Sequence, residues 1–246
     1  MVGAVASGIN AVAGGGSLVS FPTLMSVIQL NSVVANATNS VALWPGSLTG
    51  ALGFKDVLSK TVHHLKKLAL PTVLGSASGA WLLKHTDAKI FDLVVPWLIL
   101  LAAVLLLLQP KIKKFATRGT GKTLPASTGM VMQFLVAVYG GYFGAGMGIM
   151  MLAAFALYVD GNIHELNAVK NVLGLIINFT CSIVFVFQGL VEPQAALPLA
   201  IGSLVGGFAA AKVSQKVDPD KLRSGIAIYG VAMAGYYMAK ALHWIH

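Results

Sequence analysis

Polar side chains occur at matching places in two long apolar stretches of this sequence. The first stretch carries amide and hydroxyl groups, and the second carries amides together with one ammonium group. They are Asn36, Thr38, Asn39 and Ser40 in the first stretch and Asn167, Lys170, Asn171 and Asn178 in the second. Apart from Thr38 and Asn178, the members of each set share one face of a helix at 3.6 residues per turn. Two such faces predict a shared pocket, whereas interhelical hydrogen bonding is the alternative for any single amide.

Lys170 is the most specific of these candidates. It is the only Lys or Arg placed well inside a predicted span in either half of the chain. Because it lies about one turn from the expected helix start, it could snorkel to the membrane surface. If it points inward instead, its charge and the neighbouring amide donors describe a site for a small oxyanion.

Two glycine clusters interrupt apolar stretches elsewhere in the chain. The first lies in AGGGSLVSFPTL and the second in GAGMGIMML. A helix broken in lipid leaves backbone groups unpaired, and the N–H groups at a helix N-terminus attract anions. Tight packing through small residues is the alternative, and it explains the GSASG segment from Gly75 to Gly79. The candidate ligand-facing residues of the clusters are Gly14, Gly15, Gly16 and Ser17 in the first and Gly144, Gly146 and Gly148 in the second.

The composition is that of an integral membrane protein. Of 246 residues, 57% are hydrophobic and 10% are charged, against about 25% charged in soluble domains. Several runs approach the about 20 apolar residues that a spanning helix needs. The formal net charge of +9 comes mostly from Lys and Arg between these runs. We read them as topology determinants beside anionic lipid and expect no nucleic-acid partner.

The residue types used in catalysis and cofactor binding are not suitably grouped. Cys181 is the single cysteine, and His63 and His64 are adjacent, which does not suit a chelating face. There is no Ser/His/Asp or Cys/His grouping. The glycines from Gly144 to Gly148 lack the preceding strand and the following acid of a dinucleotide-binding motif. We therefore expect no enzyme activity, no metal and no cofactor.

Eight apolar units, in two groups of four, must position the candidate residues. The loop Pro110–Pro125 is basic and rich in turn-forming residues, and we read it as a cytoplasmic linker between the halves. The expected domains are residues 1–109, the linker 110–125 and residues 126–246. The expected units are Val2–Leu30 and Ser127–Val159, both interrupted, and Val33–Phe54, Lys67–Leu83, Ile90–Leu108, Leu166–Phe187, Ala195–Ala211 and Leu222–Leu242.

The internal repeat is visible in individual residues as well as in the order of the apolar units. Three patterns recur in the same order, and each pattern keeps one constant offset. This recurrence predicts an internal duplication. The matched residues are Gly8, Gly14 and Gly16 with Gly140, Gly146 and Gly148; NATNSV from Asn36 with NAVKNV from Asn167; and Pro71, Gly75 and Gly79 with Pro198, Gly202 and Gly206.

Each interrupted unit is one broken span or a re-entrant hairpin. Val2–Ala13 would be about 18 Å long at ~1.5 Å per residue, too short to cross alone. With hairpins, the basic loop Lys212–Arg223 falls inside the cell and the loop near Glu192 outside, as the positive-inside rule requires; with single spans both placements reverse. We therefore expect an all-α polytopic membrane protein. Its two inverted-topology repeats would each hold a glycine-broken hairpin and three transmembrane helices.

The glycine clusters, together with ANATNSVALWPGSLTGALGF and NAVKNVLGLIIN, resemble the TauE/SafE family of sulfite and organosulfonate exporters. The resemblance covers nearly the whole chain. It implies a multi-pass protein of the cytoplasmic membrane whose partners are the bilayer and a small sulfur anion such as sulfite or a sulfonate. The second copy has Val169 where the family pattern leads us to expect Thr, so that position offers no hydroxyl.

The function expected from these features is secondary export of a small sulfur oxyanion. An anion channel or uniporter is the alternative, and a membrane-embedded enzyme or assembly subunit is disfavoured because no catalytic grouping is present. Any proton coupling would fall to titratable residues near helix ends, which are otherwise ordinary loop residues. The sequence does not determine whether the protein forms a homo-oligomer, or whether the natural chain starts further upstream. Those titratable residues are His63, His64, His164 and Glu165.

Overall fold

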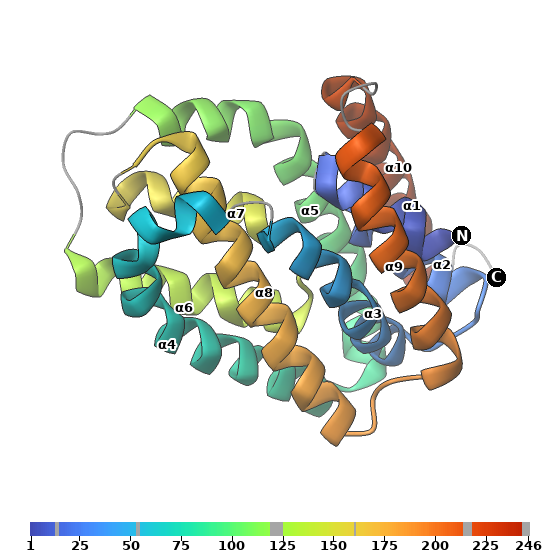
Figure 1. Cartoon of the computed structure of the whole chain (residues 1–246). Coiled ribbons are helices and arrows are strands. Elements are labelled where there is room, and N and C mark those ends of the chain that lie inside the picture. Colours follow the sequence, from blue (N-terminus) through green and yellow to red (C-terminus); the bar gives the residue numbers. More distant parts are fainter. Residues whose placement is uncertain (13–14, 53–54, 119–124, 160, 214–217, 243–246) are drawn as a thin grey trace.

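The structure is a computed structural model that describes residues 1–246 except 13–14, 53–54, 119–124, 160, 214–217 and 243–246. The described residues form ten α-helices and no strand (Figure 1), which confirms the predicted all-α class. In chain order, two short helices are followed by three long ones, and this order then repeats. The helices are α1 (Val2–Val12), α2 (Ser17–Ser26), α3 (Ser32–Leu52), α4 (Lys55–His85), α5 (Ala88–Arg118), α6 (Ala126–Tyr142), α7 (Met147–Tyr158), α8 (Ile163–Phe187), α9 (Pro193–Val213) and α10 (Pro219–Ala241).

Two segments between the predicted apolar units are helical. The segment Lys55–Lys67 forms the first turns of α4, and α5 continues through Pro110 to Arg118. A proline inside a helix removes one hydrogen bond and kinks it, but the Lys and Ala residues that follow are good helix formers. The link between the halves therefore begins after Arg118, and most of it lies outside the described residues.

Local capping determines where two functional helices begin. The side chain of Asn162 accepts the backbone N–H groups of His164 and Glu165, and the Glu165 carboxylate accepts the backbone N–H of Asn162. This capping box starts α8 at Ile163. The Asp218 carboxylate caps α10 by accepting the backbone N–H groups of Asp220 and Lys221, and a proline is the first helical residue.

The first pair of short helices forms a hairpin. α1 runs parallel to α9, because Gly3 lies against Leu199 and Gly8 faces Gly206 further along both helices. α2 then runs back, and its last residue, Ser26, hydrogen-bonds near the end of α10. Both ends of the α1–α2 unit therefore lie at the same end of the bundle.

The second pair of short helices forms another hairpin. α6 runs parallel to α4, with Gly75 facing Phe134 and Gly79 facing Val138. Side chains at these two glycines would overlap the α6 backbone, so GSASG is a close-packing segment, as predicted. α7 then returns, and Tyr158 at its end lies back against the first turn of α6.

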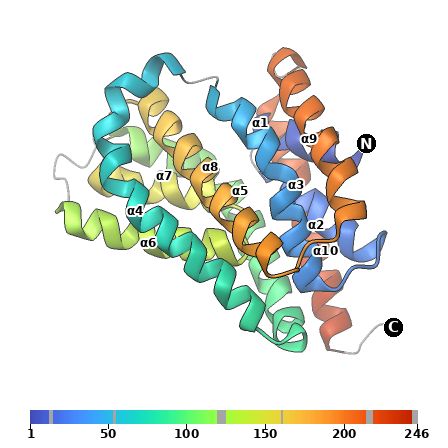
Figure 2. The ribbon, with the colours of Figure 1, turned by 60° about the horizontal axis from the view of Figure 1, so that its bottom comes forward.

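The two hairpins enter the bundle from opposite ends. We call the end where α5 finishes and α10 starts the basic end; it carries Lys111–Arg118 and Lys221–Arg223. α9 runs towards this end and α4 runs away from it (Figures 1 and 2). Because α1 follows α9 and α6 follows α4, the α6–α7 hairpin enters from the basic end and the α1–α2 hairpin from the other.

The principal contacts between the halves come in exchanged pairs. α1 packs on α9 as α6 packs on α4, and α3 packs on α9 as α8 packs on α4. Matching residues also meet: Asn178 donates to the Ser47 hydroxyl over 3.4 Å, and Gly230 lies against Ala103. Contacts between equivalent residues are expected on a two-fold axis. They support the inverted repeat, whose axis in the membrane plane stays a prediction.

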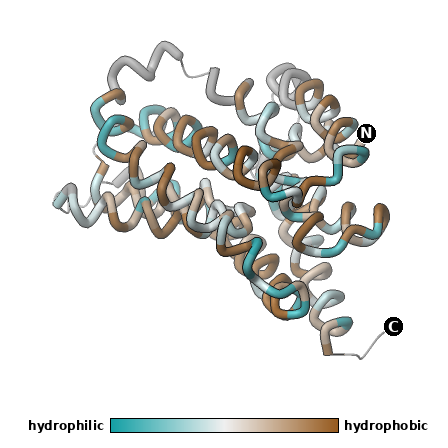
Figure 3. The backbone as a smooth tube through the Cα atoms, turned by 90° about the horizontal axis from the view of Figure 1, so that it is seen from below, coloured by the Kyte–Doolittle hydropathy of each residue, from teal (hydrophilic) through white to brown (hydrophobic). Residues whose placement is uncertain are grey.

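Apolar side chains cover much of the outer surface. Trp97, Ile201 and Ile228 are 60%, 64% and 67% exposed. Hydrophobic colouring follows the long helices in Figure 3, while hydrophilic colouring gathers at several helix ends and links. Among the described helices, α5 over Ala88–Ala116 and α8 over His164–Phe187 are long and apolar enough to span a bilayer. Such a surface suits a lipid environment.

Candidate functional site

Both helix breaks pack against the same short stretch of α5. A side chain at Gly15 would lie 3.1 Å from the Leu106 side chain. One at Gly146 would lie 3.3 Å from the Cα of Ala102 and 3.4 Å from the Leu105 side chain. Leu105 and Leu106 lie three and four positions after Ala102, so both share a face of α5 with it. The tips of the two hairpins therefore converge on the middle of α5.

The α6–α7 break holds its backbone in an unusual shape. Gly144 and Gly146 have φ values of +82° and +80°, in the left-handed region that glycine tolerates. Within the described part of the chain, the backbone N–H groups of Ala145, Gly146 and Gly148 donate no hydrogen bond. They lie at the N-terminus of α7, where the helix dipole is positive, so the break presents donors to an anion.

Two carbonyl groups of the same break are held by side chains. The Tyr139 hydroxyl donates to the carbonyl of Ala145 over 2.6 Å, and the Asn36 amide of α3 donates to the carbonyl of Tyr142 over 2.8 Å. Asn36 is buried. Two carbonyls of the break are thus paired with side chains, while several of its N–H donors are open.

Lys170 lies over this break. Its aliphatic stem is next to Gly148, where an added Cβ would stand 3.4 Å from the Lys170 Cδ. Its Nζ donates to the Asn167 Oδ1 over 3.1 Å, one turn earlier on α8. Because the stem packs on the start of α7, the side chain lies among helices of the bundle. An ammonium group thus accompanies the free N–H donors of the break.

The remaining polar candidates have different hydrogen-bond partners. Asn39 accepts a short hydrogen bond from the Ser20 hydroxyl of α2, and Ser40 donates back to the Asn36 carbonyl over 3.0 Å. Thr38 lies elsewhere, because its hydroxyl accepts the Glu192 backbone N–H that precedes α9. The side chain of Asn171, which is half-buried, makes no hydrogen bond within the described residues.

The α1–α2 break differs from its counterpart. Gly14 lies outside the described residues. Gly15 has a φ of +97°, and a side chain at Gly16 would overlap the Ala6 carbonyl. Gly16 is thus required for packing of α2 on α1. Ser17 is half-buried at the start of α2 and contributes no described hydrogen bond.

Two polar residues of α6, one at the break and one nearer the start of the helix, were not among the sequence candidates. Tyr139 holds the tip, as described above. Gln133 is fully buried; its amide donates to the Thr72 hydroxyl over 3.0 Å, and its Oε1 has no partner within the described residues. A glutamine inside an apolar run was a visible signal for Gln133, whereas a tyrosine in such a run gives none.

A shallow groove of about 630 Å³ lies between α4, α6 and α8 on the outer face, lined mainly by apolar atoms. Trp81 and Leu82 on its wall are exposed, and no glycine of either break lines the groove. We therefore do not include it in the site.

Comparison with known proteins gives a consistent result. The model of a family described as "Sulfite exporter TauE/SafE" matches residues 1–237. A "Probable membrane transporter protein" of Haemophilus influenzae is 26% identical over 245 residues, which cover 100% of this chain and 94% of the relative. The "Probable membrane transporter protein YfcA" of Escherichia coli K12 is 25% identical over 251 residues, covering 99% and 91%. The "Probable membrane transporter protein YunE" of Bacillus subtilis is 25% identical over 240 residues, covering 89% and 88%. No solved structure matches the chain significantly.

Proposed function

Because this chain belongs to the sulfite exporter TauE/SafE family, and is therefore a membrane transporter, we propose that it is a secondary carrier that exports sulfite or an organosulfonate across the cytoplasmic membrane. The positive-inside rule places the basic end in the cytoplasm. With the cell interior negative, an anion leaves with a gain of about 2.3 kcal/mol per charge per 100 mV. Export then requires no proton coupling.

One observation carries this proposal, namely the ammonium group of Lys170 beside the open N–H donors of the α6–α7 break. Sulfite and sulfonate groups present several oxygen acceptors around one centre and carry negative charge. Fixed N–H donors and an ammonium group suit such a ligand better than a cation or a neutral solute. The carbonyls of Tyr142 and Ala145 are already paired with side chains, which leaves the open N–H groups as the donors available to an anion.

In this proposal, each residue has a distinct role. Lys170 supplies the charge, and Asn167 holds its Nζ near the break. Gly148 keeps the approach to the start of α7 open, because a side chain would occupy the space beside Lys170. Asn36 and Asn39 hold the two hairpins against α3. The bound anion would then lie near the middle of α5, between the hairpin tips.

Proteoliposomes with the purified protein test the proposal. Uptake of labelled sulfite, sulfoacetate, sulfate and acetate is measured separately. We expect saturable transport and counterflow of sulfite or sulfoacetate, with little transport of acetate. The sulfur-anion assignment fails if acetate alone is carried, or if none of the four moves. Single-channel currents without saturation would show that the protein is an anion channel instead.

A further inference from the structure

Three cationic side chains from three different helices form a series that leads from the break towards the basic end. Lys170 of α8 lies over the break, and Lys113 of α5 is within electrostatic range of it. Lys113 also lies towards Arg223, because α5 and α10 pack together in opposite directions, with Gly230 of α10 against Ala103 of α5. The two cations are within electrostatic range of each other. Lys113 follows Leu105, which packs at the hairpin tip, by eight residues, or about 12 Å at ~1.5 Å per residue.

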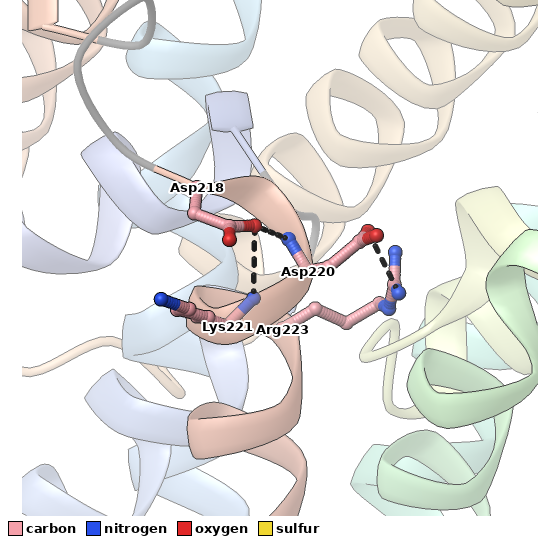
Figure 4. A network of polar contacts seen from close by, with 4 residues as sticks. All are labelled: Asp218, Asp220, Lys221 and Arg223. Carbon is pink, nitrogen blue, oxygen red and sulfur yellow. Dashed lines mark hydrogen bonds and ion pairs between the residues drawn. The ribbon is translucent and has the colours of Figure 1, made fainter.

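Arg223 is turned into the protein rather than towards solvent. Its side chain is 14% exposed, while that of its partner Asp220 is 77% exposed; the two meet at 2.9 Å (Figure 4). An ion pair with one water-exposed partner contributes little stability, about 0–1 kcal/mol. The Asp220 carboxylate can therefore give way to another oxyanion at modest cost.

Few acidic groups offset these cations. Asp218 is engaged as the cap of α10, where it accepts the backbone N–H groups of Asp220 and Lys221 over 2.9 and 3.3 Å (Figure 4). Glu165 is engaged in the capping box of α8. Asp220 is the one carboxylate that acts on Lys113 within the described residues. The series thus has an excess of positive charge in a partly buried setting.

We propose that Lys113 and Arg223 form a second oxyanion site, which receives the anion at the basic end before it reaches Lys170, and that Asp220 occupies Arg223 when this site is empty. The inference rests on the proposed function for the identity of the anion. Burial of Arg223 at the α5–α10 contact favours a free small oxyanion over a lipid phosphate, because a lipid headgroup would approach from the outer surface.

Two substitutions test the second site. In oriented proteoliposomes, Lys113→Gln should raise the KM for sulfite presented at the basic end about tenfold, the usual effect of losing one charge-assisted contact. Asp220→Asn should lower that KM, because the competing carboxylate is gone. For sulfite at the opposite face, both variants should keep the wild-type KM. Lys111→Gln, at an exposed position on α5, removes the same charge and should change neither value.

Other outcomes would overturn the inference. Equal KM changes at both faces would show a general effect on the carrier. An effect of Lys113→Gln in vesicles containing phosphatidylglycerol, but not in pure phosphatidylcholine, would identify a lipid headgroup as the ligand.

Thermal stabilisation by sulfate in detergent separates this inference from the proposed function, because it requires no transport. The second site predicts a weaker shift for Lys113→Gln than for Lys111→Gln, even if sulfite is not a substrate. Equal shifts would contradict the site.

Discussion

At the scale of single residues, Lys170 and Gly148 determine what the α6–α7 break can bind. Lys170 contributes the charge, and Gly148 contributes space and a backbone donor without a described partner. Their contact joins two helices that are separated by a turn in the chain. Changes at these two positions therefore address binding more directly than changes at glycines with positive φ, where any side chain strains the backbone.

Replacing Lys170 should impair transport much more than folding. Lys170→Ala removes one charge-assisted contact worth about 1.5–3 kcal/mol, which corresponds to about tenfold to hundredfold in affinity. Lys170→Arg should restore only part of the activity, because the guanidinium group is larger and planar. Sulfite flux and yield of folded protein are measured for both, with Lys67→Ala at an exposed site as the charge-matched control. Wild-type flux in Lys170→Ala would assign Lys170 to membrane snorkelling.

A methyl group at Gly148 should weaken anion binding without unfolding the protein. Its Cβ would make an ordinary contact of 3.4 Å with the Lys170 stem and occupy the approach to the break. We expect Gly148→Ala to raise the KM for sulfite severalfold with little change in thermal stability. Gly225→Ala on α10, where nothing lies within 4 Å of the new methyl group, is the matched control. Identical KM values in the two variants would make Gly148 a packing residue only.

The sequence named Asn36 and Lys170 as candidates, and both contact the α6–α7 break, but the sequence did not show how the candidates pair. The 3.6-residue period predicted that Asn167 and Lys170 share a face, and these two side chains do meet. Thr38 was also a candidate for the site, but its hydroxyl accepts the Glu192 backbone N–H instead. The partners of Asn36 and Asn39 lie on other helices, and spacing along one helix carries no information about which neighbour faces it.

At the scale of helices, the α6–α7 tip depends on side chains that replace missing backbone partners. Tyr139 pairs with the Ala145 carbonyl and Asn36 with the Tyr142 carbonyl. In an apolar setting an unpaired carbonyl costs about 1–3 kcal/mol. The order of the tip, and with it the position of the open N–H donors, therefore rests on these two contacts.

Tyr139→Phe should loosen the tip. It leaves the ring in place and removes the hydroxyl that bonds the Ala145 carbonyl over 2.6 Å. We expect a loss of about 1–3 kcal/mol in stability, seen as a lower Tm, together with a higher KM for sulfite. Tyr236→Phe removes a hydroxyl from a side chain that is 42% exposed and should leave both values unchanged. Equal Tm values for the two variants would show that the Tyr139 hydroxyl does not hold the tip.

Helix breaks were predictable from the sequence, whereas the ends of the long helices were not. The glycine clusters marked the breaks, because glycine at a left-handed φ is a local property of the backbone. Helices α4 and α5 are longer than predicted, α4 at its start and α5 at its end. A Lys-rich segment is compatible with both a loop and a solvated helix. Only the structure shows that Pro110 lies within a continuing helix.

At the scale of the whole molecule, the matched contacts between halves give the bundle its arrangement. Two hairpins from opposite ends meet at the middle of α5, and equivalent residues meet at the α3–α8 and α5–α10 crossings. The duplication was visible in the sequence because the offsets are constant. The pairing of each short first helix with the fourth helix of the other half was not, because it is a contact between distant segments.

Cysteine accessibility tests the predicted orientation. In a Cys181→Ser background, single cysteines at Thr117 and Ser214 should react only with reagent from the cytoplasmic side, because both adjoin the basic end in sequence. Ser214 itself lies outside the described residues. A cysteine at Asp87, in the exposed link between α4 and α5, should react only from outside. Labelling of Thr117 and Ser214 from opposite sides would contradict the inverted arrangement.

The position of the bound anion tests the central claim most directly. Crystals soaked with selenite, the selenium analogue of sulfite, would locate the ligand through anomalous scattering. The account predicts a peak at the α6–α7 break, beside Gly148 and the Nζ of Lys170 and close to the middle of α5. A peak farther than one helix diameter, about 10 Å, from the glycines of both breaks would contradict it, and the two clusters would then serve helix packing alone.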